Sequence, residues 1–408
     1  MYYETPFTTS RRDFPLVELT GHEACVVRGT FSNDDKLATA SADSSAKIWD
    51  LNVGRLIVTL SGGHIHPLTD CTWHGSGNWV VTSCEGGAVL LWDIRASAEG
   101  PIGRAKCEDP AYCVSMGNSP NCCSLASGDS QGVLHLWDIR QFASLSSHYT
   151  SSQNKPHIDT VASHGPLSSV GYAQDDSVIF TAGLDGMIRL WSSWSGDCLR
   201  TLGAGASGTE CMGATMQSRD IRDKSTPVYV AGLYSDGLAR VWDLRSHQTM
   251  RWLHGFEQPG NNCRGMSESA PSSRAQSVQG SPQSTSTKAP SNKEEGDKIK
   301  HFCRPCVTTD SEAPLLFVPG LDRRLYVIDL CSGKQTGRSP VGHLCALSSV
   351  SANSNGRVLA TTGYGRDASA VIWLVQKTTG EEEETEVEEL NKGAFHEVPP
   401  QIAGLRAS

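Results

Sequence analysis

The sequence predicts an all-β protein built from seven repeated units of short antiparallel strands. Glycine accounts for 40 of 408 residues, roughly a tenth, against a usual share of about 7%. Without the spacing of collagen, so much glycine indicates many tight turns between short strands. A tryptophan position and an aspartate position also recur along the chain at a fixed offset from each other.

The first unit runs from Gly21 to Asp50 and shows the repeat most clearly. It begins with Gly-His, continues through an apolar strand, a polar turn, a second strand and an Asp turn, and ends with a third strand closing in Trp-Asp. A fourth apolar stretch, GRLIVTL, follows, and a new Gly-His begins at Gly63 and His64. Each unit therefore contains four strands and about 45 residues.

Both positions can be followed to the end of the chain. The tryptophan slot is filled by Trp49, Trp92, Trp137, Trp191, Trp242 and Trp373, and by Ile328 in the sixth unit. Six positions earlier, five of the units have Asp43, Asp185, Asp236, Asp322 and Asp367, whereas the second and third have Gly86 and Gln131. Because two residue types agree at one offset, we interpret the units as a true internal repeat.

These Gly-His…Trp-Asp units resemble the WD-repeat family over residues 15–376. The resemblance implies an all-β, seven-bladed β-propeller of four-stranded antiparallel blades, stacked side by side because no blade can bury its faces alone. It also implies a polar network in each blade that joins a loop histidine, a strand hydroxyl, the turn aspartate and the tryptophan. On this basis the first blade has the one full set, formed by His22, Ser41, Asp43 and Trp49.

Other blades fill the network only in part. The remaining members implied by the resemblance are His64, His164 (one residue early), Asp185, Trp191, Asp236, Trp242, Asp322, His343, Asp367 and Trp373. Since a partly satisfied buried network is costly, we expect the second and third blades, which lack the aspartate, to depend more on packing than on polar bonds.

The two ends of the chain are expected to close the ring. After Val371–Val375 the chain becomes polar and acidic, so blade seven lacks a fourth strand. The segment PLVELT at Pro15–Thr20 precedes the first Gly-His, where an outer strand belongs. An unpaired edge would invite aggregation, so we predict that this N-terminal strand completes blade seven.

Composition predicts four segments outside the repeat. They are an N-terminal tail (1–14), an acidic disordered C-terminal tail (377–408), a polar insertion at about 144–158 and a disordered insertion at about 258–300 between blades five and six. The larger insertion is rich in Ser, Pro, Gly and Gln and cannot bury enough apolar surface to offset its ordering entropy. It is read as a tolerated surface loop, with a regulatory segment around Ser281-Pro282 as the alternative.

No cofactor, metal site or catalytic site is expected. Cys303 and Cys306 have the spacing of a zinc half-site with His301 nearby, but no second pair completes four ligands. The alternative is that they belong to blade six's first strand, facing the core. Neither a Gly-rich phosphate loop nor a nucleophile elbow is present.

Charge and cysteine content limit which partners and which cellular compartment are expected. The net charge is −9, and seven of the negative charges come from glutamates within 381–389. The rest is near neutral, so nucleic acid is not an expected partner. A membrane is not expected either, because no apolar stretch approaches the roughly 20 residues of a membrane helix. Fourteen cysteines without an apolar leader indicate reduced thiols and a cytoplasmic protein, with the nucleus and the cilium left open.

The expected function is a non-catalytic scaffold that binds other proteins in a multiprotein assembly. A first alternative is a substrate receptor of a cullin-4 ubiquitin ligase, because Trp-Asp-x-Arg recurs and resembles the motif that docks a cullin-4 adaptor; its arginines are Arg95, Arg140 and Arg245. A second is a ciliary or axonemal assembly protein, from a faint similarity in CTWHGSGNWV. On the opposite face, Leu184 and Leu321 precede the turn aspartate and are the candidate apolar anchors.

Overall fold

The structure is a computed structural model. It describes residues 17–375 except 53, 97–99, 143–155, 204–207, 218–227, 246–248, 253–301, 309–313, 332 and 340. The two predicted tails and the insertion at 258–300 lie outside the described residues, as does most of the insertion at 144–158.

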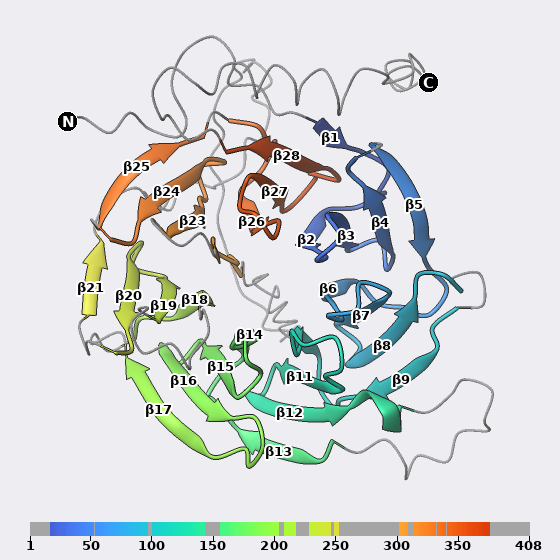
Figure 1. Cartoon of the computed structure of the whole chain (residues 1–408), viewed down its shortest axis with the longest axis horizontal. Coiled ribbons are helices and arrows are strands. Elements are labelled where there is room, and N and C mark those ends of the chain that lie inside the picture. The colour runs from blue at the N-terminus through green and yellow to red at the C-terminus, as the bar shows by residue number, and fades with distance from the viewer. Residues whose placement is uncertain are drawn as a thin grey trace, which may run out of the picture.

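Seven four-stranded antiparallel sheets stand around a central channel (Figure 1). Blade one contains β2(Val26–Phe31), β3(Lys36–Ser41), β4(Ala46–Asp50) and β5(Arg55–Leu60). Blade two contains β6(Leu68–Trp73), β7(Trp79–Cys84), β8(Ala88–Asp93) and β9(Gly103–Lys106). Blade three contains β10(Ala111–Met116), β11(Ser124–Asp129), β12(Val133–Asp138) and β13(Ile158–Val161). Blade four contains β14(Leu167–Tyr172), β15(Val178–Gly183), β16(Met187–Ser192) and β17(Cys198–Gly203). Blade five contains β18(Cys211–Gln217), β19(Tyr229–Tyr234), β20(Ala239–Asp243) and β21(Thr249–Trp252). Blade six contains β22(Cys306–Val307), β23(Leu315–Pro319), β24(Leu325–Asp329) and β25(Lys334–Arg338). Blade seven contains β26(Leu347–Ala352), β27(Val358–Gly363), β28(Ala370–Leu374) and, from the N-terminus, β1(Val17–Leu19). The predicted seven-bladed propeller is confirmed.

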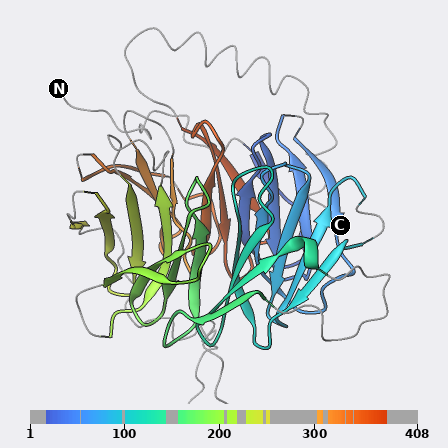
Figure 2. The ribbon, with the colours of Figure 1, turned by 60° about the horizontal axis from the view of Figure 1, so that its bottom comes forward.

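Burial along each blade follows the position of the strand in the ring. The second strands are buried almost throughout, as in β7, because neighbouring blades cover both of their faces. The outermost strands face solvent, and β5 has three exposed residues in a row. Figure 2 shows the blades standing side by side around the ring.

The hydrophobic core is divided among the gaps between blades. Seven clusters of buried side chains occur in the described part of the chain, and each joins two neighbouring blades. The cluster between blades one and two, for example, combines Ile48 and Leu60 with Leu68, Val80 and Trp92. A single blade has no core of its own, so it is stable only between its neighbours.

The N-terminal strand closes the ring. β1 pairs antiparallel with β28, and Val17, Glu18 and Leu19 lie opposite Ile372, Val371 and Ala370. Leu19 is buried in the cluster between blades seven and one. The predicted closure by Pro15–Thr20 is confirmed for the three residues of β1.

Blade six has the shortest innermost strand, β22, with two residues. Just before it, the Arg304 guanidinium crosses the channel. Its Nη1 lies 2.6 Å from Oδ2 of Asp70 in blade two, and its Nη2 donates to the carbonyl of Tyr112 in blade three at 2.9 Å. Cys306 lies in β22, the first strand of blade six, as the alternative for this Cys pair expected, whereas Cys303 precedes the strand and is buried between blades five and six. Blade six is thus tied to the opposite side of the ring.

Helix is almost absent from the described ranges, where the one helical element is the 3-10 turn η2(Ile139–Gln141). None of the helical structure in these ranges is long and apolar enough to cross a membrane.

Ring closure predicts the effect of truncating Leu19. Leu19→Ala should lower the free energy of unfolding by about 2–4 kcal/mol, because it removes buried methyl groups at the closing joint. Chemical denaturation would measure this. Glu18→Ala, one residue away on the exposed face of β1, is the matched control and should change stability little. Equal stability of the two variants would contradict closure by β1.

Candidate functional site

Blade one has a complete polar network, but with a different hydroxyl from the expected one. His22 Nδ1 lies 2.8 Å from Oδ2 of Asp43, and His22 Nε2 lies 2.9 Å from Oγ1 of Thr39. The indole Nε1 of Trp49 donates to the same hydroxyl at 2.9 Å. Ser41, expected in this place, instead donates to the carbonyl of Ala24. It lies at the end of β3, whereas Thr39 lies further into the sheet, within reach of the indole.

Blade seven also has a complete network, so blade one is not the one full set. His343 Nδ1 lies 2.7 Å from Oδ2 of Asp367, and its Nε2 lies 2.7 Å from Thr361 Oγ1. Trp373 donates to Thr361 at 2.7 Å. Thr361 stands twelve residues before its tryptophan and Thr39 ten before its own. This longer turn hid the match in the sequence.

In blade two the network lacks its carboxylate. His64 Nε2 lies 2.7 Å from Thr82 Oγ1, and Trp92 Nε1 donates to that hydroxyl at 2.8 Å. Gly86 occupies the aspartate slot, and the buried Nδ1 of His64 has no hydrogen-bond partner among the described residues. Burial therefore lowers the pKa of His64 to about 3, with a smaller contribution from the positive charge of Arg104.

His164 lies outside the network of blade four. His22, His64 and His343 each precede the first strand of their blade by four residues, and before β14 that position belongs to Ser163. His164 therefore comes one residue late, and its side chain is exposed. Only its backbone N–H reaches Asp185, at 3.4 Å from Oδ2.

Blades three to six use a different polar pair. The residue two positions before the tryptophan slot reaches back to an aspartate near the turn: His135 to Asp129, Arg189 to Asp185, Arg240 to Asp236 and Tyr326 to Asp322. Blade three was expected from Gln131 to depend more on packing than on polar bonds, but it too has a polar pair of this kind. In blades four to six the spacing Asp-x-x-x-Arg or Asp-x-x-x-Tyr is the sequence signal for this pair, and it does not depend on the histidine of the repeat.

His135 is held between two carboxylates. Its Nε2 lies 3.1 Å from Oδ2 of Asp129, and its Nδ1 lies 2.5 Å from Oδ1 of Asp159 on β13. Burial alone would lower its pKa, but Asp129, Cys107 and Asp159 outweigh burial and raise the pKa to about 11. A protonated His135 thus joins three strands of blade three.

The networks fix the loops that face solvent at one end of the ring, here called the upper face. Oδ2 of Asp43 and of Asp367 also accepts the backbone N–H of the residue after the histidine, Glu23 at 3.1 Å and Leu344 at 3.0 Å. The buried side of each loop is therefore anchored, and the next side chain points outward. Ile65 has the same position in blade two.

The apolar groups on the upper face are different from the predicted ones. Leu184 is only 8% exposed, and Leu321 packs against the cluster between blades five and six, so neither is an open anchor. Instead Ile65 is 89% exposed and Leu344 is 76% exposed. They belong to blades two and seven, on either side of Glu23 in blade one. The sequence signal for Ile65 and Leu344 is their position directly after the histidine of the repeat.

The Trp-Asp-x-Arg arginines lie at the opposite end, the lower face, in the turns after β8, β12 and β20. Arg95 and Arg140 are exposed, and each pairs with the aspartate of its own motif, Asp93 at 2.7 Å and Asp138 at 2.6 Å. Arg245 is half-buried. The structure therefore presents two of the three predicted arginines on neighbouring blades.

The described residues were compared with the side-chain groups that bind metal ions. No group of three or more His, Cys, Asp or Glu side chains in the described ranges could hold a metal ion. The buried thiols of Cys303 and Cys113 have pKa values that burial raises to about 12, so they remain protonated at neutral pH.

The network predicts different costs for two histidines. His22→Ala should lower the free energy of unfolding by about 2 kcal/mol, because Thr39 and Asp43 each lose one hydrogen bond and a buried ring is removed. His164→Ala should cost less than about 0.5 kcal/mol, because its side chain is exposed. Urea denaturation of both would measure this. A larger loss from His164→Ala would contradict the assignment of Ser163 to the histidine position.

His135 predicts a stability effect that depends on pH. Its folded pKa lies above the ordinary value of 6.5, so its stabilisation is complete below that value and is lost as pH rises toward about 11. The stability difference between wild type and His135→Gln should be largest at about pH 6 and should shrink by about pH 10. Denaturation at several pH values would measure it, with His164→Gln as the exposed control. A gap that widens with pH would contradict a charged His135.

Comparison with known proteins gives consistent similarities. A family model described as "WD domain, G-beta repeat" matches residues 14–50, 54–93 and 156–192. The chain is 25% identical to the COMPASS component SWD3 of Saccharomyces cerevisiae over 256 residues, which is 61% of this chain and 77% of that protein.

Two further relatives match over shorter lengths. The histone-binding protein MSI1 of Saccharomyces cerevisiae is 25% identical over 54% of this chain and 50% of its own length. The target of rapamycin complex subunit wat1 of Schizosaccharomyces pombe is 25% identical over 41% of this chain and 48% of its own length. The alignments thus span half or less of these two relatives.

Proposed function

We infer that this seven-bladed β-propeller of the WD-repeat family is a protein-binding scaffold within a multiprotein assembly. Two of the relatives bear names that make them a component or a subunit of a complex, COMPASS and the target of rapamycin complex. The fold is suited to binding other proteins, because a closed ring of stacked blades presents rigid loops at both ends. Binding rather than catalysis is the activity we propose.

The observation that carries this proposal is the pair of exposed aliphatic side chains on the upper face. Ile65 and Leu344 stand on loops whose buried side is anchored by His64 and His343. A large apolar side chain held on a rigid loop loses little conformational entropy when a partner covers it. Glu23 lies between them in sequence order around the ring, and Glu85 and Arg366 are exposed on turns at the same end. This face therefore combines exposed aliphatic side chains with charged ones, as protein interfaces do.

A second candidate rests on the lower face. Arg95 is 63% exposed and Arg140 is 73% exposed, in equivalent turns of neighbouring blades. This arrangement favours docking to a cullin-4 adaptor, the role that the Trp-Asp-x-Arg resemblance implies. The chain would then be a substrate receptor, with the upper face free for the substrate.

One experiment separates the two faces. Affinity purification with mass spectrometry would compare wild type with Ile65→Asp/Leu344→Asp and with Arg95→Ala/Arg140→Ala. The scaffold proposal expects the upper-face variant to lose its main partner by roughly tenfold, because buried anchors carry most of the binding energy. The lower-face variant should retain it. Each variant serves as the folded control for the other.

The outcomes are distinct. Loss of a cullin-4 adaptor from the lower-face variant alone would favour the ligase receptor. Retention of every partner by the upper-face variant would contradict the role of Ile65 and Leu344.

We also propose that the protein works in the cytoplasm. The described cysteines are all free thiols, which suits a reducing compartment. Fluorescence microscopy of the tagged chain would test this, and accumulation in the nucleus or the cilium would contradict it.

A further inference from the structure

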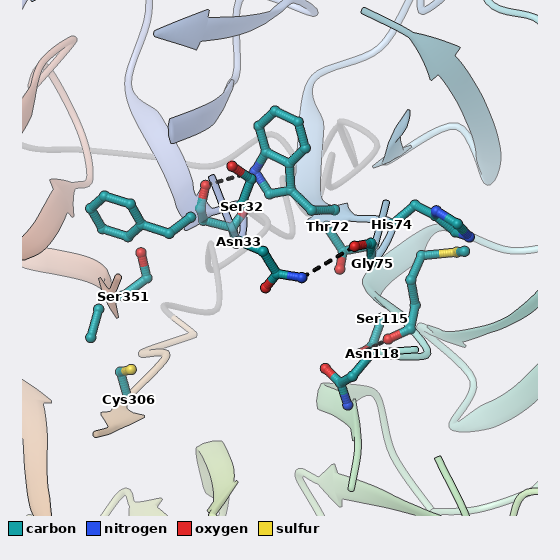
Figure 3. A pocket seen from close by; sticks show the side chains of 14 residues that line it. Ser32, Asn33, Thr72, His74, Gly75, Ser115, Asn118, Cys306 and Ser351 are labelled. Atoms are coloured by element: carbon teal, nitrogen blue, oxygen red, sulfur yellow. Dashed lines mark hydrogen bonds between the residues drawn. The ribbon is translucent and has the colours of Figure 1, made fainter. Parts of the chain in front are cut away.

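A cavity of about 250 Å³ lies at the lower end of the central channel, where the innermost strands end. Figure 3 shows Ser32, Asn33, His74 and Asn118 among the side chains around it. None of the wall residues is an Asp, Glu, Lys or Arg. The charged side chains that a partner can reach lie on the outer surface, and those of the upper face follow a pattern.

Blades two and seven present the same arrangement on the upper face with opposite charge. These two blades stand on either side of blade one (Figure 1). In blade two, Ile65 follows the histidine of the repeat and Glu85 precedes the position of the turn aspartate. In blade seven the same two positions hold Leu344 and Arg366. Each of the two blades therefore presents one exposed aliphatic side chain and one exposed charge, and the charges differ in sign.

The two charges are available to a partner. Glu85 and Arg366 are exposed, and neither side chain makes a hydrogen bond or an ion pair with another described residue. Their turns are nevertheless fixed. The N–H of Glu85 donates to the carbonyl of Pro67 at 3.0 Å, and Asp367, next to Arg366, is bonded to His343. Both charges therefore stand on anchored backbone.

This arrangement is self-complementary. When two copies meet upper face to upper face, a two-fold axis that lies in the plane of contact and passes over blade one exchanges blades two and seven. Blade two of each copy then lies over blade seven of the other. Ile65 and Glu85 of one copy come to the region of Leu344 and Arg366 of the second copy, so aliphatic groups are covered together and opposite charges meet twice.

We propose that the occupant of the upper face is a second copy of this chain, in a two-fold dimer formed by blades seven, one and two. The proposal rests on the proposed function, because it assigns a partner to the surface that contains Ile65 and Leu344. Burial of the aliphatic side chains on anchored loops supplies the binding free energy. The two contacts between Glu85 and Arg366 select the orientation and exclude other arrangements.

Glu23 distinguishes a second copy from a basic partner. It is exposed in blade one, the blade beneath the axis, so the Glu23 side chains of the two copies approach each other. Like charges across an interface oppose association. A basic partner would instead be attracted by Glu23. Removal of this charge therefore strengthens a two-fold dimer and weakens binding of a basic partner.

Sedimentation equilibrium of the purified full-length chain tests the proposal. We expect a dimer that weakens as NaCl rises from about 0.1 M to about 1 M, because exposed ion pairs are screened. Glu85→Arg alone and Arg366→Glu alone should each weaken the dimer by about tenfold or more, because each variant brings like charges together at two places. The double variant Glu85→Arg/Arg366→Glu should return to within about threefold of the wild-type affinity, because opposite charges meet again.

Two further variants complete the design. Arg357→Glu reverses an exposed charge in the same blade at its lower end and should leave the dimer unchanged. Glu23→Gln is a mild change at an exposed position and should strengthen the dimer by about twofold or more. Circular dichroism of every variant confirms that it is folded.

A wild-type chain that stays monomeric at about 0.1 mM would overturn the proposal. So would a double variant that does not recover association, or weaker association of Glu23→Gln. These results leave the proposed function open to its own test, because the affinity purification measures binding of other proteins. A monomeric wild type together with loss of a partner from Ile65→Asp/Leu344→Asp would mean that a different protein occupies the upper face.

Discussion

Closure of the ring is the constraint on which the other features of this protein depend. Every hydrophobic cluster in the described residues lies between two blades, so each blade needs both neighbours. The chain ends would leave one gap open, and the pairing of β1 with β28 fills it. The blades then stand at fixed angles, which sets the positions of the loops at both faces and of the charged groups inside the channel.

The polar networks show that one structural role can be filled by different side chains. Blades one and seven use histidine, threonine, tryptophan and aspartate, whereas blades four and five use an arginine that reaches back to the turn aspartate. Both arrangements pair the turn aspartate and hold the same turn. A repeat can therefore lose one member of its motif and keep its geometry, provided that another side chain satisfies the carboxylate.

The candidate interface was only partly predictable. The recurrence of Trp-Asp-x-Arg was sufficient to find Arg95 and Arg140, because their position follows from the end of the third strand of each blade. Leu184 and Leu321 were poor choices, since the sequence did not show that their turns pack inward. Ile65 and Leu344 project outward because the preceding histidine is anchored below them, which depends on contacts with residues about 20 positions away.

By itself the sequence determined the number of blades, their strand order and the closing N-terminal strand, because these follow from local periodicity and from a repeat with one missing strand. Which hydroxyl joins each network, and which histidine lies outside it, was decided by strand register and by turns of different length. The channel was decided entirely by the tertiary structure. Arg304 and Asp70 are 234 residues apart, and no local pattern indicates that they meet. Only the closed ring brings them together, with Arg28 Nε also 3.3 Å from Asp70.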